Sequence, residues 1–212
     1  MNQFDQFSTD IFSTKIFNFK ILNIDTNKLK QECFLFKDND NHDRPQHSNY
    51  GGWQSSCIQS NNLDISLYTE MYKLYKIIDD ELLTDLSLYY SDNIRLNVLA
   101  MWVNINNKND FNWDHIHSDS IFSGVFYVNV PEDSDSNLQF VRDMREMTSL
   151  FHNVYQQDPA CKRHSKPDLT NSWNIKPEQN SFVLFPGHLT HRVQPNKSLE
   201  ERISIVFDVG II

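Results

Sequence analysis

The sequence predicts a mainly β protein, an antiparallel sandwich or jelly-roll barrel with flanking helices packed on its outside. Two patterns carry this prediction. Apolar residues recur at intervals of three and four in residues 67–90, which indicates one or two amphipathic helices. Beyond Asp92 apolar and polar residues alternate instead, as in half-buried strands. No internal repeat or linker interrupts the chain, so we expect a single domain over residues 1–212.

The remaining elements follow in chain order. Residues 13–24 alternate polar and apolar side chains and predict an early strand, residues 27–32 a short helix, and residues 38–49 a polar loop. We expect residues 1–92 to give strand and helical support and residues 93–212 to form the β core. The predicted core strands are residues 94–105, 121–130, 138–143, 181–185 and 202–211.

Composition narrows the class of protein. The net charge of -9 and the lack of any Lys/Arg-rich run disfavour nucleic-acid binding. The N-terminus lacks the pattern of a signal peptide, and no stretch has the length of a membrane span, which predicts a cytoplasmic protein without membrane partners. Cys33, Cys57 and Cys161 are odd in number and far apart, so we expect reduced thiols.

The stretch NWDHIHSDS, residues 112–120, suggests a metal site. Residues two apart on a strand share a face, so Trp113, His115 and His117 are predicted to point the same way, together with Asp119 if the strand persists. Two imidazoles and a carboxylate with open positions form the non-haem Fe(II) arrangement. An HxH pattern is weak evidence by itself, and solvated histidines remain the alternative.

The C-terminal region offers a third histidine and an anion receptor. Two extended runs flank the turn segment 195–200, and a symmetric hairpin about this turn would place His191 directly opposite Arg202. Arg202 and Ser204 are two apart and share a face, where a guanidinium and a hydroxyl together suit a carboxylate. The sequence therefore predicts a third imidazole ligand with a carboxylate clamp beside it.

Each of these residues has a competing interpretation. Arg202 alone could form a surface ion pair with Glu200 or Glu201. His188 competes with His191 as the ligand, but it lies three residues away, on the opposite face of any regular strand. We therefore prefer His191.

Together these residues resemble the 2-oxoglutarate and Fe(II)-dependent oxygenases, which share a double-stranded β-helix fold. More narrowly, the chain is similar to the oxygenases of this class in marine bacteria and their phages, so a host cytoplasm is the expected location if it is phage-encoded. The similarity spans most of the chain. Four motifs carry it: SNYGGWQSS at residues 48–56, MWVNIN at 101–106, HIHSDSIFSGVFYV at 115–128 and VLFPGHLTH at 183–191.

The resemblance implies a cofactor, a cosubstrate and a reaction. Fe(II) is the metal, and 2-oxoglutarate binds it and is converted with O2 to succinate and CO2, usually with hydroxylation of a substrate. Arg202 and Ser204 match the residues that bind the far carboxylate of 2-oxoglutarate. We also expect Asn104 and Tyr127, on strands near the metal motif, to bind cosubstrate or substrate; ordinary strand residues are the alternative.

The sequence departs from the wider superfamily in the opening motif, which is HxD there. Here His115 and His117 form HxH, while His117 and Asp119 form HxD. HxH recurs in the narrower family, which favours His115, His117 and His191 as the catalytic metal ligands, with Asp119 in place of His115 as the alternative. A three-imidazole site leaves the iron more positively charged.

Two other functions remain open at this point. A cupin-like dioxygenase could use three histidines without a cosubstrate, although it would not need Arg202 and Ser204. A non-catalytic jelly-roll module would bind no metal. The segment 142–176 is long for a connection between strands, and we predict that it covers the site as a lid.

Overall fold

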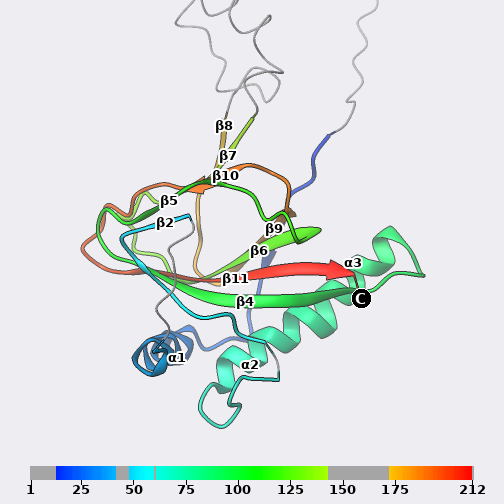
Figure 1. Ribbon diagram of the computed structural model, residues 1–212, viewed down its shortest axis with the longest axis horizontal. Coiled ribbons are helices and arrows are strands. Elements are labelled where there is room, and N and C mark those ends of the chain that lie inside the picture. The colour runs from blue at the N-terminus through cyan, green and yellow to red at the C-terminus, as the bar shows by residue number, and fades with distance from the viewer. Residues whose placement is uncertain (1–12, 42–47, 60, 143–171, 212) are drawn as a thin grey trace, which may run out of the picture.

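Two antiparallel sheets face each other in the computed structural model, which describes residues 13–41, 48–59, 61–142 and 172–211 (Figure 1). The larger sheet has the spatial order β1 (Phe17–Lys20), β9 (Ser181–Pro186), β6 (Phe122–Asn129), β11 (Arg202–Ile211), β4 (Leu96–Asn106) and β3 (Trp53–Gln54). The smaller sheet has the order β2 (Asn49–Tyr50), β5 (Phe111–His115), β10 (His191–Val193), β7 (Leu138–Val141) and β8 (Ser172–Ile175).

The helices cover the outer face of the larger sheet (Figure 1). They are α1 (Thr26–Asn39), α2 (Thr69–Lys76), the π-helical segment η1 (Ile77–Leu82) and α3 (Leu83–Tyr90). Asp25 caps α1, since its carboxylate accepts two backbone N–H groups of the first turn. Glu32 of α1 caps the next helix, accepting from the backbone of Glu70 at 3.0 Å and Met71 at 2.8 Å. These two bonds fix α1 against α2.

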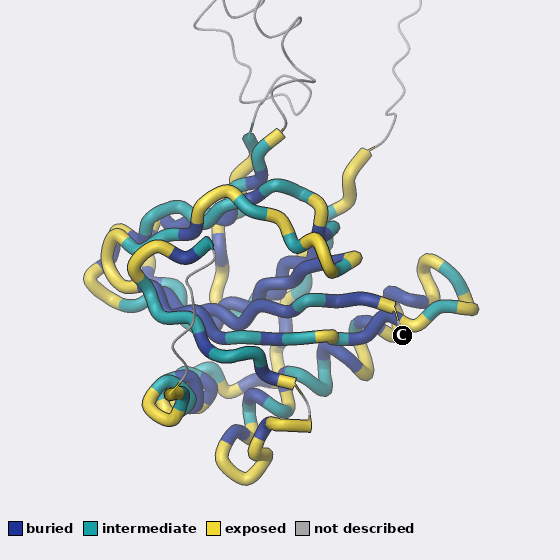
Figure 2. The backbone as a smooth tube through the Cα atoms, viewed as in Figure 1, coloured by how far each residue is buried: buried dark blue, intermediate teal, exposed yellow. Residues whose placement is uncertain are grey.

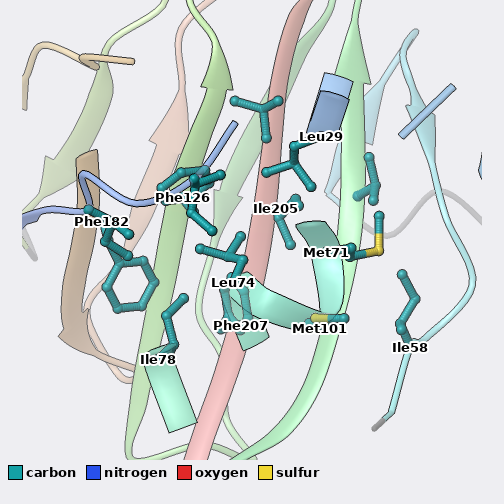
Figure 3. Packing of buried hydrophobic residues seen from close by; sticks show 14 of the residues in the cluster. Leu29, Ile58, Met71, Leu74, Ile78, Met101, Phe126, Phe182, Ile205 and Phe207 are labelled. Carbon is teal, nitrogen blue, oxygen red and sulfur yellow. The ribbon is translucent and has the colours of Figure 1, made fainter. Parts of the chain in front are cut away.

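The main hydrophobic core lies between these helices and the larger sheet (Figure 3). Met71, Leu74 and Ile78 project from the helices, and Ile205 and Phe207 project from β11 to meet them. All five side chains are fully buried. The predicted helical spacing of Met71, Leu74 and Ile78 therefore serves packing, and each of the five side chains contributes about 1.5–3 kcal/mol by burial.

A second, smaller apolar cluster fills part of the space between the two sheets. Val125, Tyr127 and Val206 contribute to it from the larger sheet, Leu138 and Phe140 from the smaller one. The central strands are consequently buried on both faces (Figure 2). Alternation along each strand decides whether a side chain meets the helices or the space between the sheets.

Several local predictions were wrong in extent. The helix predicted at residues 27–32 continues to Asn39, and the strand predicted at 13–24 shortens to β1. Ser172–Ile175 form a strand paired with β7, whereas we predicted loop there. The rest of the predicted lid, residues 143–171, lies outside the described residues.

The predicted hairpin between His191 and Arg202 is wrong. His191 belongs to the smaller sheet, whereas Arg202 pairs with Asn106 in the larger sheet. The connection between β10 and β11 crosses from one sheet to the other. Buried Asn196 holds this crossing, because its side-chain amide donates to the carbonyls of Asn106 at 3.1 Å and Glu200 at 2.8 Å. Local turn composition does not distinguish such a crossing from a hairpin.

Two features of the N-terminal part bear on the predicted organisation. β1 and β3 form the two edges of the larger sheet, so residues before 93 contribute strands as well as helices. Assignment of residues 1–212 to one domain remains a prediction. Among the helices of the described residues, none combines the length and the apolar character that crossing a membrane requires.

Candidate metal centre

Three imidazoles meet at one end of the space between the sheets. His115 ends β5, and His191, which begins β10, is its direct cross-strand partner. His117 follows β5 by two residues and completes the group. One ring nitrogen from each histidine lies within 4.8 Å of the other two. Within the described part of the chain, no other group of His, Cys, Asp and Glu side chains meets this criterion.

Backbone carbonyls fix the protonation of two of these rings. Nδ1 of His115 lies 2.7 Å from the carbonyl oxygen of Trp113, and Nδ1 of His191 lies 2.8 Å from that of Leu189. A carbonyl oxygen only accepts hydrogen bonds, so Nδ1 carries the proton in each ring. Nε2 then keeps a free electron pair, the form in which imidazole binds a metal.

A carboxylate plays the same part for the third ring. Nδ1 of His117 lies 2.8 Å from Oδ1 of Asp208, on β11 of the opposite sheet. Trp102 of β4 stacks on the other side of the imidazole, with ring centroids 5.8 Å apart. These contacts hold His117 in place although the regular strand has already ended at His115.

Burial favours the neutral form of His115 and His191. It lowers the pKa of His191 to about 3, and the neighbouring charges of His115 and His117 act in the same direction. Burial also lowers the pKa of His115. Neutral imidazole is the ligand form, so these two rings can bind a divalent metal at ordinary pH.

The competing ligands lie outside the group. Asp119 is exposed in a turn, because β5 ends at His115. Asp119 as a ligand in place of His115 would require the strand to continue to residue 119. His188 is exposed in the turn that precedes β10. Trp113, expected on the face of the histidines, lies at the cavity wall and is 59% exposed.

Gly187 allows the turn that carries His117 to approach closely. The backbone N–H of His117 donates to the carbonyl of Gly187 at 2.8 Å. A Cβ atom at position 187 would lie 2.5 Å from the carbonyl oxygen of Ser120 and 2.7 Å from that of His117. Any larger residue would therefore displace the turn and His117 with it.

The histidines open into a cavity of about 600 Å³ that also contains Arg202 and Ser204. Arg202 is 1% exposed, and its Nη1 donates to Ser204 Oγ at 3.1 Å and Asn106 Oδ1 at 3.4 Å. Its guanidinium carbon lies 5.2 Å from the centre of the Tyr127 ring. Among the described residues, no carboxylate lies within ion-pair distance of Arg202, and its Nε has no hydrogen-bond partner.

Asn104 and Tyr127 lie on either side of Ser204. Ser204 is the cross-strand partner of both, so the three side chains form one row across β6, β11 and β4, with Gln54 of β3 beyond Asn104. Asn104 lines the cavity, and its buried Oδ1 has no partner within the described chain. Tyr127 is buried beside Arg202; burial raises the pKa of Tyr127, and the charge of Arg202 opposes this.

Sequence reasoning missed Asp208, Trp102 and Asn106. Asp208 has the same parity on β11 as Arg202 and Ser204, so continuing the alternation would have found it. The other two required knowledge of the pairing between β4 and β11, which no local pattern reveals.

A family model described as "Putative 2OG-Fe(II) oxygenase" matches residues 100–208, which include the three histidines and Arg202. The chain belongs to this family of 2OG-Fe(II) oxygenases. No match was found among curated proteins.

Solved structures resemble this oxygenase in fold. A prolyl-4-hydroxylase from Pseudomonas putida superposes with a TM-score of 0.62 at 13% identity, covering 92% of this chain and 93% of that one. HygX from Streptomyces hygroscopicus, solved with nickel and 2-oxoglutarate, gives 0.58 at 12% identity, covering 93% and 83%. A prolyl hydroxylase from Trichoplax adhaerens, in complex with a hypoxia inducible factor peptide, gives 0.56 at 11%, covering 92% and 83%. The predicted double-stranded β-helix is confirmed.

The residues present fit the cofactors of the family, Fe(II) and 2-oxoglutarate. Three imidazoles suit a borderline divalent metal such as iron. The buried guanidinium of Arg202 suits a carboxylate. The three histidines and Arg202 border the same cavity, so one molecule of 2-oxoglutarate could contact both the metal and the guanidinium.

Proposed function

We propose that this oxygenase is a 2-oxoglutarate- and Fe(II)-dependent dioxygenase that hydroxylates its substrate and releases succinate and CO2. The observation that carries the proposal is the cavity face of β11, where Arg202 is fully buried and no carboxylate of the described residues forms an ion pair with it. An uncompensated buried charge is unfavourable by several kcal/mol. A bound dicarboxylate removes this penalty, because one carboxylate neutralises Arg202 while the other end of the molecule reaches the histidines.

Each predicted site residue then has a role. His115, His117 and His191 hold the metal through Nε2. Arg202 and Ser204 bind the distal carboxylate of 2-oxoglutarate. When bound, iron and 2-oxoglutarate together supply the oxidative decarboxylation and the oxidant that reacts with the substrate.

Residues between the two ends of the cavity position the cosubstrate. Asn104 and Tyr127 lie beside Ser204. The amide oxygen of Asn104 and the hydroxyl of Tyr127 have no hydrogen-bond partner within the described chain and offer hydrogen bonds to cosubstrate or substrate. Val125, Leu138 and Val206 line the same cavity with apolar groups. These side chains exclude water around a bound molecule, which strengthens the charge interaction at Arg202.

An anaerobic titration tests the proposal. Fe(II) and 2-oxoglutarate added together should give a weak visible charge-transfer band and raise the thermal unfolding temperature. Arg202→Leu should weaken 2-oxoglutarate binding at least about 100-fold, because it removes a buried charge partner. Arg192→Leu is the matched control, since Arg192 is partly exposed and paired with Asp114 at 3.2 Å.

The outcomes separate the candidate functions. Charge transfer followed by succinate release on admission of O2 supports the proposal. The three-histidine group also favours a cupin-like dioxygenase without a cosubstrate, for which iron would bind while 2-oxoglutarate leaves no spectral or thermal trace. Absence of iron binding would favour a non-catalytic module. The likeness to oxygenases of marine bacteria and phages remains a prediction.

A further inference from the structure

Asp208 contacts the metal centre from the opposite sheet. Its carboxylate lies 2.8 Å from Nδ1 of His117, the nitrogen that faces away from the other two rings if Nε2 binds the metal. The side chain of His117 is 10% exposed and that of Asp208 is 25% exposed, so the contact is largely shielded from water. A charge-assisted hydrogen bond in such surroundings is roughly twice as strong as a neutral one.

The position of Asp208 is itself fixed. It pairs with Ala100 of β4 and Ser123 of β6, directly before a register shift on the β4 side, so its backbone is held by a strand on each side. Ser120 Oγ lies 3.4 Å from Asp208 Oδ1 and 3.2 Å from the carbonyl of His117, and it connects the strand to the turn that carries the histidine. The carboxylate is therefore held in place on β11 whether or not a metal is bound.

The hydrogen bond between Asp208 and His117 also affects the charge around the metal centre. Two histidines and one carboxylate, the common non-haem iron arrangement, place one negative charge directly on the metal. Three imidazoles place none there. Asp208 supplies a carboxylate one hydrogen bond away, and its negative charge makes the imidazole of His117 a more basic ligand.

We propose that Asp208 is a positioning residue. It orients the imidazole of His117, and its negative charge strengthens electron donation from that imidazole to the metal. This inference rests on the proposed metal site. Asp208 carries two separable functions, orientation of the ring and donation of charge. Asparagine at this position retains an oxygen that accepts from Nδ1 but lacks the charge, whereas alanine lacks both.

Metal affinity in the absence of 2-oxoglutarate tests the proposal without reference to turnover. Fe(II) is titrated anaerobically against a chromogenic chelator with the wild type, Asp208→Asn and Asp208→Ala. Loss of a carboxylate that orients a histidine ligand weakens metal binding about 10–100-fold. We expect a loss in this range for Asp208→Ala and a smaller loss for Asp208→Asn. Asp119→Asn, which removes an exposed carboxylate from the same cavity wall, should change the affinity less than about twofold.

A spectroscopic measurement distinguishes charge donation from simple support of the fold. Without the carboxylate the iron is less electron-rich, so the Fe(II)–2-oxoglutarate charge-transfer band should move to shorter wavelength in Asp208→Asn. A band at the wild-type position, with wild-type iron affinity in a folded Asp208→Asn protein, would overturn the proposal even if Asp208→Ala failed to fold.

X-ray absorption of the cobalt-substituted protein tests whether Asp208 is itself a ligand. Three imidazoles bound in both the wild type and Asp208→Asn support a positioning role. A carboxylate ligand present in the wild type and lost in Asp208→Asn contradicts it. Failure of the proposed function looks different, because the wild type itself would then bind no iron, or would bind iron and give no charge-transfer band with 2-oxoglutarate.

Discussion

The two faces of strand β11 differ in almost every physical respect. The outer face of β11 consists of Ile203, Ile205 and Phe207, all buried against the helices and neighbouring strands. The cavity face of β11 consists of Arg202, Ser204, Val206 and Asp208, so a guanidinium, a hydroxyl and a carboxylate border the cavity together with one apolar side chain. Both faces belong to the same ten residues, which are paired on each side.

The difference shows how one strand can separate stability from chemistry. Apolar burial on the outer face favours folding, whereas a buried arginine without an anion opposes it. Successive side chains alternate, so the stabilising residues hold the polar ones in position at a fixed spacing. The comparison predicts that substitutions on the outer face change stability and substitutions on the cavity face change binding.

Phe207→Ala should have the largest effect on stability. It removes a fully buried ring that packs edge-on against Phe182, with centroids 5.6 Å apart. Such truncations lower the free energy of unfolding by about 3–5 kcal/mol, which urea denaturation would measure. Affinity for 2-oxoglutarate per folded molecule should be unchanged; a large loss of affinity would break the separation of the two faces.

Acid should destabilise the metal-free protein through His191. Its folded-state pKa of about 3 lies below the unfolded value of 6.5, so the unfolded chain binds a proton that the folded chain does not. The stability contributed by neutral His191 is complete above pH 6.5 and declines below it, by about 1.4 kcal/mol per pH unit until the folded pKa is reached. Urea unfolding between pH 4.5 and 7.5 measures this slope.

Two variants show whether His191 causes that slope. His191→Gln should flatten it, and His188→Gln, at an exposed position, should leave it unchanged. Equal slopes in all three proteins would contradict the assignment to His191.

Arg202→Leu should leave the metal-free, cosubstrate-free protein as stable as the wild type or more stable by about 1–2 kcal/mol. Replacing a buried charge with an apolar side chain removes its desolvation penalty. Thermal unfolding of both proteins without ligands measures the difference. A loss above about 2 kcal/mol would mean that Arg202 supports the fold through its bonds to Ser204 and Asn106.

Ser204→Ala should have the smallest effect. The hydroxyl lies 3.1 Å from Arg202 Nη1 and offers one hydrogen bond to a bound carboxylate. Its loss should weaken 2-oxoglutarate binding about fivefold, corresponding to about 1 kcal/mol, as isothermal titration of the iron-loaded protein under anaerobic conditions would show. A loss as large as that of Arg202→Leu would make the hydroxyl an equal partner in the clamp.

The sequence was most informative where the regular spacing of side chains along one strand or helix decides which way they face. Alternation along 202–207 correctly separated the residues facing the helices from those facing the cavity, and spacing in 67–90 predicted the helices. Asp208 was not predicted as a site residue, although the same alternation places it on the cavity face with Arg202 and Ser204. The strand order could not be predicted, because contacts between distant segments depend on tertiary packing.

His191 illustrates that limit. Its inclusion in the site was predicted from a hairpin with Arg202 that does not exist. The structure brings it to the other histidines through pairing of β10 with β5 and not through the predicted hairpin. Its role as a metal ligand remains a prediction. The sequence contains the donor types, but only the two-sheet fold shows that Arg202 and His191 lie on different sheets around one cavity.

A crystal structure grown anaerobically with Fe(II) and 2-oxoglutarate tests the central claim most directly. The account predicts iron bonded to Nε2 of His115, His117 and His191 at about 2.1 Å, a nitrogen–metal distance typical of histidine ligands. It also predicts the distal carboxylate of 2-oxoglutarate on Arg202 and Ser204. Iron held by Asp119 in place of His115, or 2-oxoglutarate bound away from Arg202, would contradict it.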